Sequence, residues 1–192
     1  LFLSLLLVQC KSDTPKTSPD SQKISSTEIE KDSSYLYKHK LSEETQKALD
    51  QLSQMPMTQG NLGSQMVEFI RDGIYDYGEQ FKFIELRWKN NTAEIIPKFR
   101  AEIDELAKIM VLFPNMRIKM ECYTDNHGDV KKLEKLSQEM VDYIKKEVVS
   151  VGVNPERIEA KGFGSKYPVA DNKTMEGQLI NNRIEITILK LF

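Results

Sequence analysis

From residue 81 onward the chain alternates between two hydrophobic periods, and this pattern restricts the fold more than any other feature of the sequence. Apolar residues recur every three or four positions along residues 97–113 and 129–151, which predicts two helices with one buried face each. Four segments alternate with a period of two and are predicted strands: residues 81–88, 118–123, 157–161 and 183–191. This order of elements predicts helices packed against one sheet, and the length of 192 residues predicts a single core.

Single residues mark the ends of these elements and the direction of one strand. Pro97 suits the first position of a helix, Asp129 can cap the next helix, and Gly152 can end it. Cys122 belongs to the inward-facing set of its strand. We therefore expect a buried thiol that behaves as a small hydrophobe rather than as a redox group.

Residues 1–10 predict a processed leader. The apolar run at residues 1–8 ends at Gln9 and Cys10, and it is shorter than the roughly 20 residues that span a bilayer. It fits the hydrophobic region of a signal peptide. A cysteine directly behind such a region resembles the lipobox of bacterial lipoproteins, which implies lipidation of Cys10, although Gln9 departs from the usual small residue. Lys11 favours sorting to the outer membrane, and the alternative is an ordinary secretory signal with a chance cysteine.

Residues 11–40 predict a flexible tether. Serine, threonine, lysine, aspartate, glutamate and proline dominate this stretch, and such a composition cannot bury enough apolar area to offset the entropy of ordering. A chain of this length would average roughly 30 Å from end to end and reach about 100 Å when extended.

Residues 41–79 predict a short helical extension. Ser42 suits the N-cap of a helix that stops at Pro56, and Met66 lies at helical spacing within a second segment that Gly73 ends. We expect a small helical lid packed on the main domain and assign it no function.

Residues 80–192 carry several separate motifs in a fixed order. They are Pro-Asn-Met-Arg-Ile-Lys-Met-Glu-Cys-Tyr-Thr-Asp-Asn-His-Gly at 114–128, Leu-Ser at 136–137, Gly-Val-Asn-Pro-Glu-Arg-Ile at 152–158, Lys-Gly-Phe-Gly at 161–164, Asp-Asn-Lys-Thr at 171–174 and Asn-Asn-Arg-Ile-Glu-Ile at 181–186. Together they resemble the OmpA-like C-terminal domain of peptidoglycan-associated lipoproteins and flagellar-motor stator proteins. The resemblance implies an α+β fold, a βαβαβ(α)β two-layer sandwich, with a groove for the peptide stem of peptidoglycan and especially its diaminopimelate residue.

The resemblance also implies a ligand-binding set, which is Asp125, Asn126, Gly128, Leu136, Ser137, Met140 and Arg183. In this set Asp125 would accept hydrogen bonds from the ligand ammonium, a task that suits a fixed carboxylate because charge-assisted bonds are short and directional. Asn126 and Gly128 would shape the loop and aim backbone N–H groups at a ligand carboxylate. The alternative role for Asp125 is capping within the loop before the second helix.

Met140 is the main departure from the family pattern. The family places an arginine at this position to grip the ligand carboxylate, and a thioether cannot replace a bidentate guanidinium. Gln178 and Asn182 also stand where the family prefers arginine. Losing a charge-assisted contact costs about 1.5 to 3 kcal/mol, which leaves three outcomes open: weaker binding, a stem peptide that lacks this carboxylate, or no binding. Met140 also continues the apolar stripe of its helix, so a simple core role is a further alternative.

The sequence predicts no metal site, cofactor or catalytic residue. Asp125, His127 and Asp129 alternate in one loop, but Gly128 falls fourth rather than sixth, as an EF-hand would require. Cys122 and His127 lack an orienting third group for nucleophilic catalysis.

These observations predict a non-enzymatic lipoprotein of the outer membrane, with its head in the periplasm, that ties the membrane to the cell wall. Its expected partners are peptidoglycan and, through a lipid anchor, the membrane. The net charge of -2 gives no field that attracts nucleic acid. The alternative is an OmpA-like scaffold that has exchanged wall binding for a protein partner in the envelope.

Overall fold

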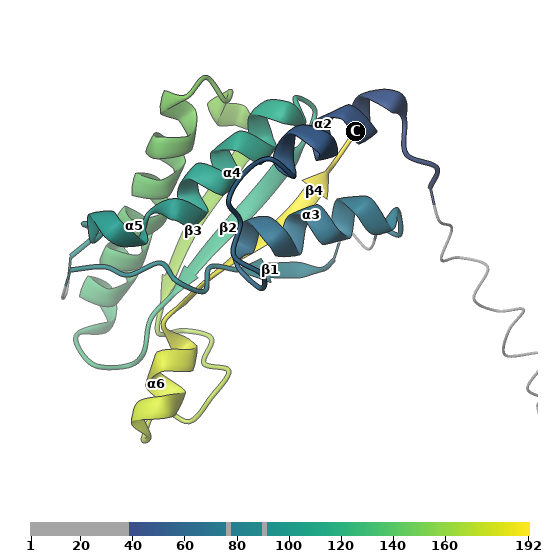
Figure 1. Ribbon diagram of the computed structural model, residues 1–192. Helices are drawn as coiled ribbons and strands as arrows, with labels where there is room; N and C mark the ends of the chain where they lie inside the picture. Colours follow the sequence, from purple (N-terminus) through teal and green to yellow (C-terminus); the bar gives the residue numbers. More distant parts are fainter. Residues whose placement is uncertain (1–38, 76–77, 90–91) are drawn as a thin grey trace, which may run out of the picture. The chain divides into compact units, whose positions relative to one another are not determined.

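The computed structural model describes residues 39–75, 78–89 and 92–192. Its helices are α2 (Glu43–Leu52), α3 (Leu62–Asp72), α4 (Ala101–Leu112), α5 (Val130–Ser150) and α6 (Met175–Asn181), with 3-10 turns η1 (Pro97–Phe99) and η2 (Pro155–Arg157). Its strands are β1 (Gln80–Lys82), β2 (Arg117–Tyr123), β3 (Ile158–Gly164) and β4 (Arg183–Lys190). Figure 1 shows the helices α2 to α5 layered on the sheet, with α6 at one end of it.

The four strands form one mixed sheet in the order β1-β4-β2-β3. Strand β2 pairs in parallel with β3 and antiparallel with β4, which places Met120 opposite Ile186. Ile118, Met120 and Cys122 point into the core and are fully buried, as the alternation of this strand predicts. The α+β two-layer sandwich is therefore confirmed. The loop between β3 and β4 contains α6, the optional helix that the family resemblance implies.

Helix α5 lies so close to β3 that the strand needs glycine. A Cβ at Gly162 would lie 2.2 Å from the backbone nitrogen of Gln138, and one at Gly164 would lie 2.7 Å from that of Glu134. The helix also binds the strand through side chains, since Gln138 accepts a hydrogen bond from the Gly162 N–H. Asp129 caps this helix by accepting from the Lys132 N–H, as predicted.

The strand predicted at residues 81–88 is wrong beyond its first residues, because β1 ends at Lys82. The carboxylate of Glu102, fully buried on α4, accepts hydrogen bonds from the N–H groups of Ile84, Glu85 and Leu86 at 2.8 to 3.1 Å. These donors are turned toward one carboxylate, so they cannot continue a strand ladder.

The strand predicted at residues 157–161 is shifted and is longer in the structure. It starts at Ile158 because Pro155 and Arg157 belong to η2. The Arg157 guanidinium donates to the carbonyl oxygens of Met110, Phe113 and Met116 at 2.7 to 2.8 Å. It thereby provides hydrogen-bond donors for backbone carbonyls at and just beyond the end of α4, which have no partner within the helix.

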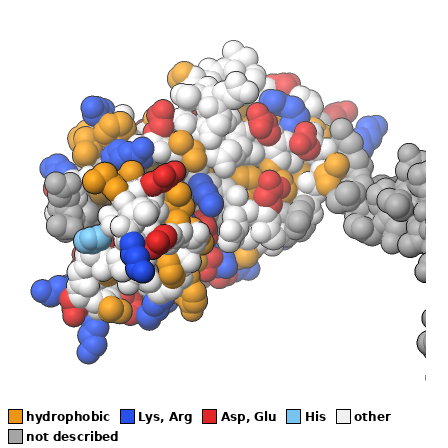
Figure 2. All heavy atoms as spheres, turned by 90° about the horizontal axis from the view of Figure 1, so that it is seen from below, with side chains coloured by type: hydrophobic (Ala, Val, Ile, Leu, Met, Phe, Trp, Pro, Cys, Tyr) orange, Lys and Arg blue, Asp and Glu red, His pale blue; other side chains and the backbone are white. Residues whose placement is uncertain are grey.

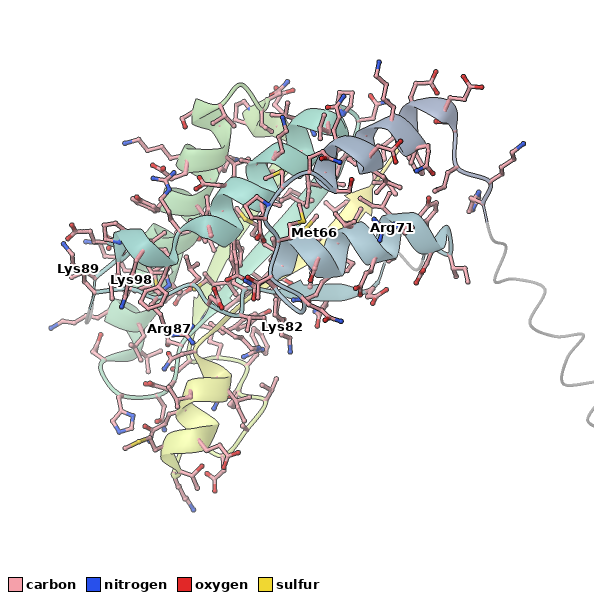
Figure 3. The ribbon with its side chains drawn as sticks, viewed as in Figure 1. Met66, Arg71, Lys82, Arg87, Lys89 and Lys98 are labelled. Carbon is pink, nitrogen blue, oxygen red and sulfur yellow. The ribbon has the colours of Figure 1, made fainter. Side chains whose placement is uncertain are left out.

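The helices α2 and α3 share the core of the sheet domain. Ser42 caps α2 by accepting from the Thr45 N–H, and Gly73 ends α3 in the left-handed region at φ 69°. Leu49 and Met66 are buried in the same hydrophobic cluster as the sheet residues, and Met66 points from α3 into the interior (Figure 3). Burial of such side chains contributes about 1.5 to 3 kcal/mol each.

The leader predicted at residues 1–10, with Cys10, and residues 11–38 of the predicted tether lie outside the described residues. Within the described residues, the helices are all too short or too polar to cross a membrane.

Candidate functional site

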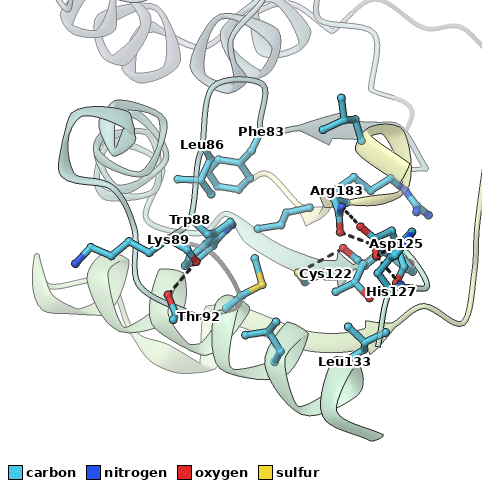
Figure 4. A pocket seen from close by; sticks show the side chains of 17 residues that line it. Phe83, Leu86, Trp88, Lys89, Thr92, Cys122, Asp125, His127, Leu133 and Arg183 are labelled. Carbon is cyan, nitrogen blue, oxygen red and sulfur yellow. Dashed lines mark hydrogen bonds and ion pairs between the residues drawn. The ribbon is translucent and has the colours of Figure 1, made fainter. Parts of the chain in front are cut away.

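A cavity of about 390 Å³ opens where β2 runs into the loop before α5. Its volume lies within the range of small-molecule and peptide side-chain pockets. The lining residues come from four parts of the fold, and they are Phe83, Leu86, Trp88, Lys89, Thr92, Cys122, Tyr123, Thr124, Asp125, His127, Leu133, Leu136, Met140, Leu179, Asn182, Arg183 and Ile184. Figure 4 shows Asp125 and Arg183 at one end, across from the apolar side chains of Phe83, Leu86 and Trp88.

Asp125 presents a partly accessible carboxylate at the polar end of this cavity. Its side chain is 19% exposed. One oxygen accepts from the His127 N–H at 2.7 Å, and the other accepts from the Asn182 side-chain amide at 2.6 Å. A carboxylate offers about four acceptor positions, so capacity remains for a donor from a ligand. The imidazole of His127 lies 3.6 Å from Asp125, and it is an ionic partner only when it is protonated.

Arg183, at the start of β4, lines the cavity but is held by its own neighbours. Its Nε donates to Glu185 at 2.8 Å, and its guanidinium stacks on the Tyr123 ring at 3.9 Å. A further nitrogen donates to the carbonyl oxygen of Tyr167 at 3.2 Å. The side chain is only 9% exposed. Arg183 therefore fixes the end of the sheet and has few donors left for a ligand.

Met140 and Leu136 lie one helical turn apart on α5 and both line the cavity. Met140 is half-buried and packs against the core while it also lines the cavity, so the predicted core packing is present and the ligand role stays a prediction. Across from them, Trp88 forms an isolated bridge with Ile95, and its ring meets Tyr143 of α5 edge to face at 6.1 Å. These contacts hold the segment that forms the apolar wall.

The other implied residues do not line this cavity. Ser137 is fully buried, donates to the Glu134 carbonyl and accepts from the Gly164 N–H at 2.8 Å. Gly128, at φ 140°, lines a separate cavity along the start of α5. Asn126 is exposed, and its carbonyl accepts from the Gly128 N–H. The structure thus gathers Asp125, Leu136, Met140 and Arg183 around the cavity and leaves these three outside it.

The competing chemistries that the loop residues suggest have local explanations. Burial raises the pKa of the Cys122 thiol to about 12, and a protonated thiol is a poor nucleophile. Asp129 is engaged as the cap of α5. Among the described residues, His, Cys, Asp and Glu side chains do not converge in groups of three that could hold a metal ion.

Two kinds of cavity residue were missing from the implied set. Asn182 both accepts from the Asp125 N–H and donates to its carboxylate, across 57 positions of the chain. Phe83, Trp88 and Leu179 form apolar walls. The sequence carried no local signal for the Asn182 contact, whereas the closely spaced aromatic residues Phe83 and Trp88 before α4 were a signal for the wall.

The fold is therefore that of an α+β domain, with a candidate ligand cavity beside a strand-to-helix loop. The sequence model that describes the OmpA family matches residues 87–182, which is half of the chain. The protein belongs to the OmpA family.

The relatives described here are two outer-membrane proteins and one peptidoglycan-binding protein by name. The chain is 29% identical over 119 residues to the outer-membrane lipoprotein YfiB of Pseudomonas aeruginosa, covering 62% of this chain and 69% of that protein. It is 31% identical over 105 residues to outer membrane porin F of Pseudomonas fluorescens, covering 55% of this chain and 32% of the porin. It is 31% identical over 99 residues to the peptidoglycan-binding protein ArfA of Mycobacterium tuberculosis, covering 52% and 30%. The chain thus spans about a third of the length of the porin and of ArfA.

Solved structures share the fold. A putative MotB-like protein from Desulfovibrio vulgaris superposes with a TM-score of 0.54 at 16% identity, covering 75% of this chain and 94% of that one. The periplasmic domain of Helicobacter pylori MotB superposes with a TM-score of 0.50 at 25% identity, covering 57% and 74%.

Proposed function

We propose that this protein is a non-enzymatic wall-binding lipoprotein that ties a membrane to peptidoglycan. In this proposal the cavity beside β2 receives a side chain of the peptidoglycan stem, and the Asp125 carboxylate accepts hydrogen bonds from its ammonium group. The observation that carries the proposal is a carboxylate that is accessible at the polar end of a cavity and has acceptor capacity left. The name of ArfA, a peptidoglycan-binding relative, supports the same ligand.

The proposed anchor is a lipid on Cys10 in the outer membrane, with the head in the periplasm. The apolar run before Cys10 and the polar stretch behind it support this proposal, as does the name of the lipoprotein relative YfiB. Each buried acyl CH₂ contributes about 0.8 kcal/mol, so several chains make a firm anchor.

Co-sedimentation with purified sacculi tests the wall-binding step. We expect the chain from residue 39 to 192, which contains the hydrophobic cluster of the described residues, to pellet with sacculi. Asp125→Ala should weaken pelleting about 10- to 100-fold because it removes a charge-assisted contact.

The matched control for this experiment is Asp142→Ala. Asp142 is an exposed carboxylate on α5 that does not line the cavity, so this variant should pellet like the wild type. Thermal unfolding of both variants checks that they fold. Unchanged pelleting of a folded Asp125→Ala variant would exclude Asp125 as the wall contact.

An envelope protein-protein interaction module is the second candidate function. Three apolar side chains of α6 are exposed, namely Met175 at 79%, Leu179 at 69% and Ile180 at 48%. Seen from below the view of Figure 1, hydrophobic side chains emerge among charged ones (Figure 2). A wild-type chain that stays in the supernatant at every sacculus concentration would favour this second candidate over wall binding.

A further inference from the structure

The chain enters the head at one end of the sheet, beside the C-terminus. The N–H group of His39, the first described residue, donates to the carbonyl oxygen of Gly73 at 2.7 Å. The His39 ring stacks on Tyr75 with 5.2 Å between the ring centroids. Tyr75 in turn meets Phe192, just past the end of β4, edge to face at 5.5 Å. These contacts fix the entry of the chain at the end of α3 and of β4.

Strand β4 connects this end of the sheet to the end that carries the cavity. It starts at Arg183, which lines the cavity and pairs with Tyr123 of β2, and it ends at Lys190. The strand has 8 residues, which at about 3.4 Å each span about 25 Å. Figure 1 shows β4 running from the end of the sheet near α6 to the opposite end, where the C-terminus lies. The cavity and the entry of the chain are therefore at opposite ends of the sheet.

Two buried carboxylates of α4 hold the first turn of α3. Glu102 accepts a hydrogen bond from the Leu62 N–H, and Glu105 accepts one from the Gly63 N–H, both at 3.0 Å. A Cβ at Gly63 would lie 2.9 Å from the Glu105 Cβ, so glycine permits this close approach. The donors are N–H groups that have no partner within their own helix. Helix α3 is thereby joined to α4 by its backbone.

Helix α3 also binds the edge of the sheet, and its apolar face is part of the core. The Gln65 amide donates to the Lys82 carbonyl oxygen at 3.1 Å and accepts from the Lys82 N–H at 3.3 Å, as a neighbouring strand would. The residues of α2 and α3 that are at most 1% exposed are Leu49, Leu52, Leu62, Met66 and Ile70. The two helices therefore share the core of the sheet domain instead of forming a separate unit.

A pull between a chain that enters here and a ligand at Asp125 acts along the strands. Hydrogen bonds of an antiparallel pair lie perpendicular to the strands, so a pull along β4 strains the bonds to the seven paired residues of β2 together. A chain attached directly to β1 would instead pull on three paired residues at the edge of the sheet. Attachment through α2 and α3 therefore gives the head more resistance to tension.

We propose that α2 and α3 are the mechanical coupling between the preceding segment of the chain and the sheet. They receive a pull at the end opposite the cavity and pass it into the core through Glu102, Glu105 and their buried apolar faces. The cavity then points away from the anchored end, and the head stays folded under tension. This inference gives the helical extension a role, and it rests on the proposed function for the source of the tension.

Pulling on single molecules tests this coupling. The full chain, purified without lipid, is held by DNA handles at Cys10 and at the thiol that Asn126→Cys introduces beside Asp125. Burial raises the pKa of the Cys122 thiol to about 12, so this thiol does not compete for the handles. We expect α2, α3 and the sheet to unfold in one step. Separate release of residues 39–79 would instead add about 140 Å of length before the sheet unfolds.

Glu105→Ala should weaken the coupling. We expect residues 39–79 to be released first, at about half the wild-type force, because the buried Gly63 N–H loses its acceptor. Asp104→Ala is the matched control on the same helix, since Asp104 is exposed and pairs with Arg100, and it should unfold like the wild type. A Glu105→Ala chain that unfolds in one step at the wild-type force would contradict the coupling.

The outcomes separate this inference from the function on which it rests, because the pulling experiment contains no peptidoglycan. Release of residues 39–79 ahead of the sheet in the wild type overturns the coupling, even if the chain pellets with sacculi. Unfolding in one step supports the coupling, and a failure to pellet would then count against wall binding alone. The wild-type trace decides the matter even if Glu105→Ala does not fold.

Discussion

At the scale of single residues, Ser137 and Asp125 differ in whether their side chains can still accept a hydrogen bond from a ligand. Both belong to motifs that resemble the family's binding site, but Ser137 is fully buried between α5 and β3, where it accepts from the Gly164 N–H. Asp125 keeps part of its carboxylate open to the cavity. Sequence motifs do not distinguish these cases, because a residue that shapes a site and one that touches a ligand can recur equally well.

Ser137→Ala should therefore lower stability without changing wall binding. The variant leaves the buried Gly164 N–H without an acceptor, which costs about 1 to 3 kcal/mol. Ser150→Ala is the matched control, since Ser150 also donates to the carbonyl three residues before it but is exposed. Urea unfolding of both variants measures the difference. Equal stability of the two variants, or lost pelleting in a stable Ser137→Ala protein, would contradict the structural role.

At the scale of elements, one buried carboxylate joins the helical extension to the wall of the cavity. Glu102 of α4 accepts from the Leu62 N–H at the start of α3 and from three successive N–H groups at residues 84–86. Its neighbour Glu105 accepts from the Gly63 N–H, and burial raises the pKa of Glu105. Helix α4 therefore binds both the helical extension at the start of α3 and the segment at residues 84–86 that follows β1.

Glu102→Gln should destabilise the fold by about 3 kcal/mol, because an amide nitrogen would face backbone donors that now share a charged acceptor. Asp104→Asn on the same helix is exposed and pairs with Arg100, so it should change stability by less than about 0.5 kcal/mol. Urea unfolding compares the two variants, and amide exchange at residues 84–86 should speed up only in the first. A Glu102→Gln protein as stable as the control would rule out the carboxylate as the link.

At the scale of the whole molecule, local patterns predicted α4, α5 and most of the sheet, whereas α6 was implied only by the family resemblance and long-range contacts decided the rest. The stripe that leads through α5 and the alternation of β2 and β4 are local, and the structure confirms them. The segment after Lys82 was misjudged because its hydrogen-bond acceptor, Glu102, lies 16 to 18 residues away. The partner of Asp125, Asn182, is 57 residues away. Contacts over such separations along the chain cannot be predicted from the spacing of hydrophobic residues.

The proposed function requires a lipid anchor that binds a membrane and a head that binds peptidoglycan, so the decisive measurement has to include both membrane and wall. Vesicles that carry the full lipidated chain are mixed with purified sacculi, and the vesicle lipid that sediments with the wall is measured. We predict that vesicles carrying the wild type sediment with the wall. Cys10→Ala should take up no palmitate label and should not attach to vesicles. Asp125→Ala should attach to vesicles, but these vesicles should not sediment with the wall. Vesicles that carry Asp125→Ala and still sediment with the wall as the wild type does would contradict the proposed function.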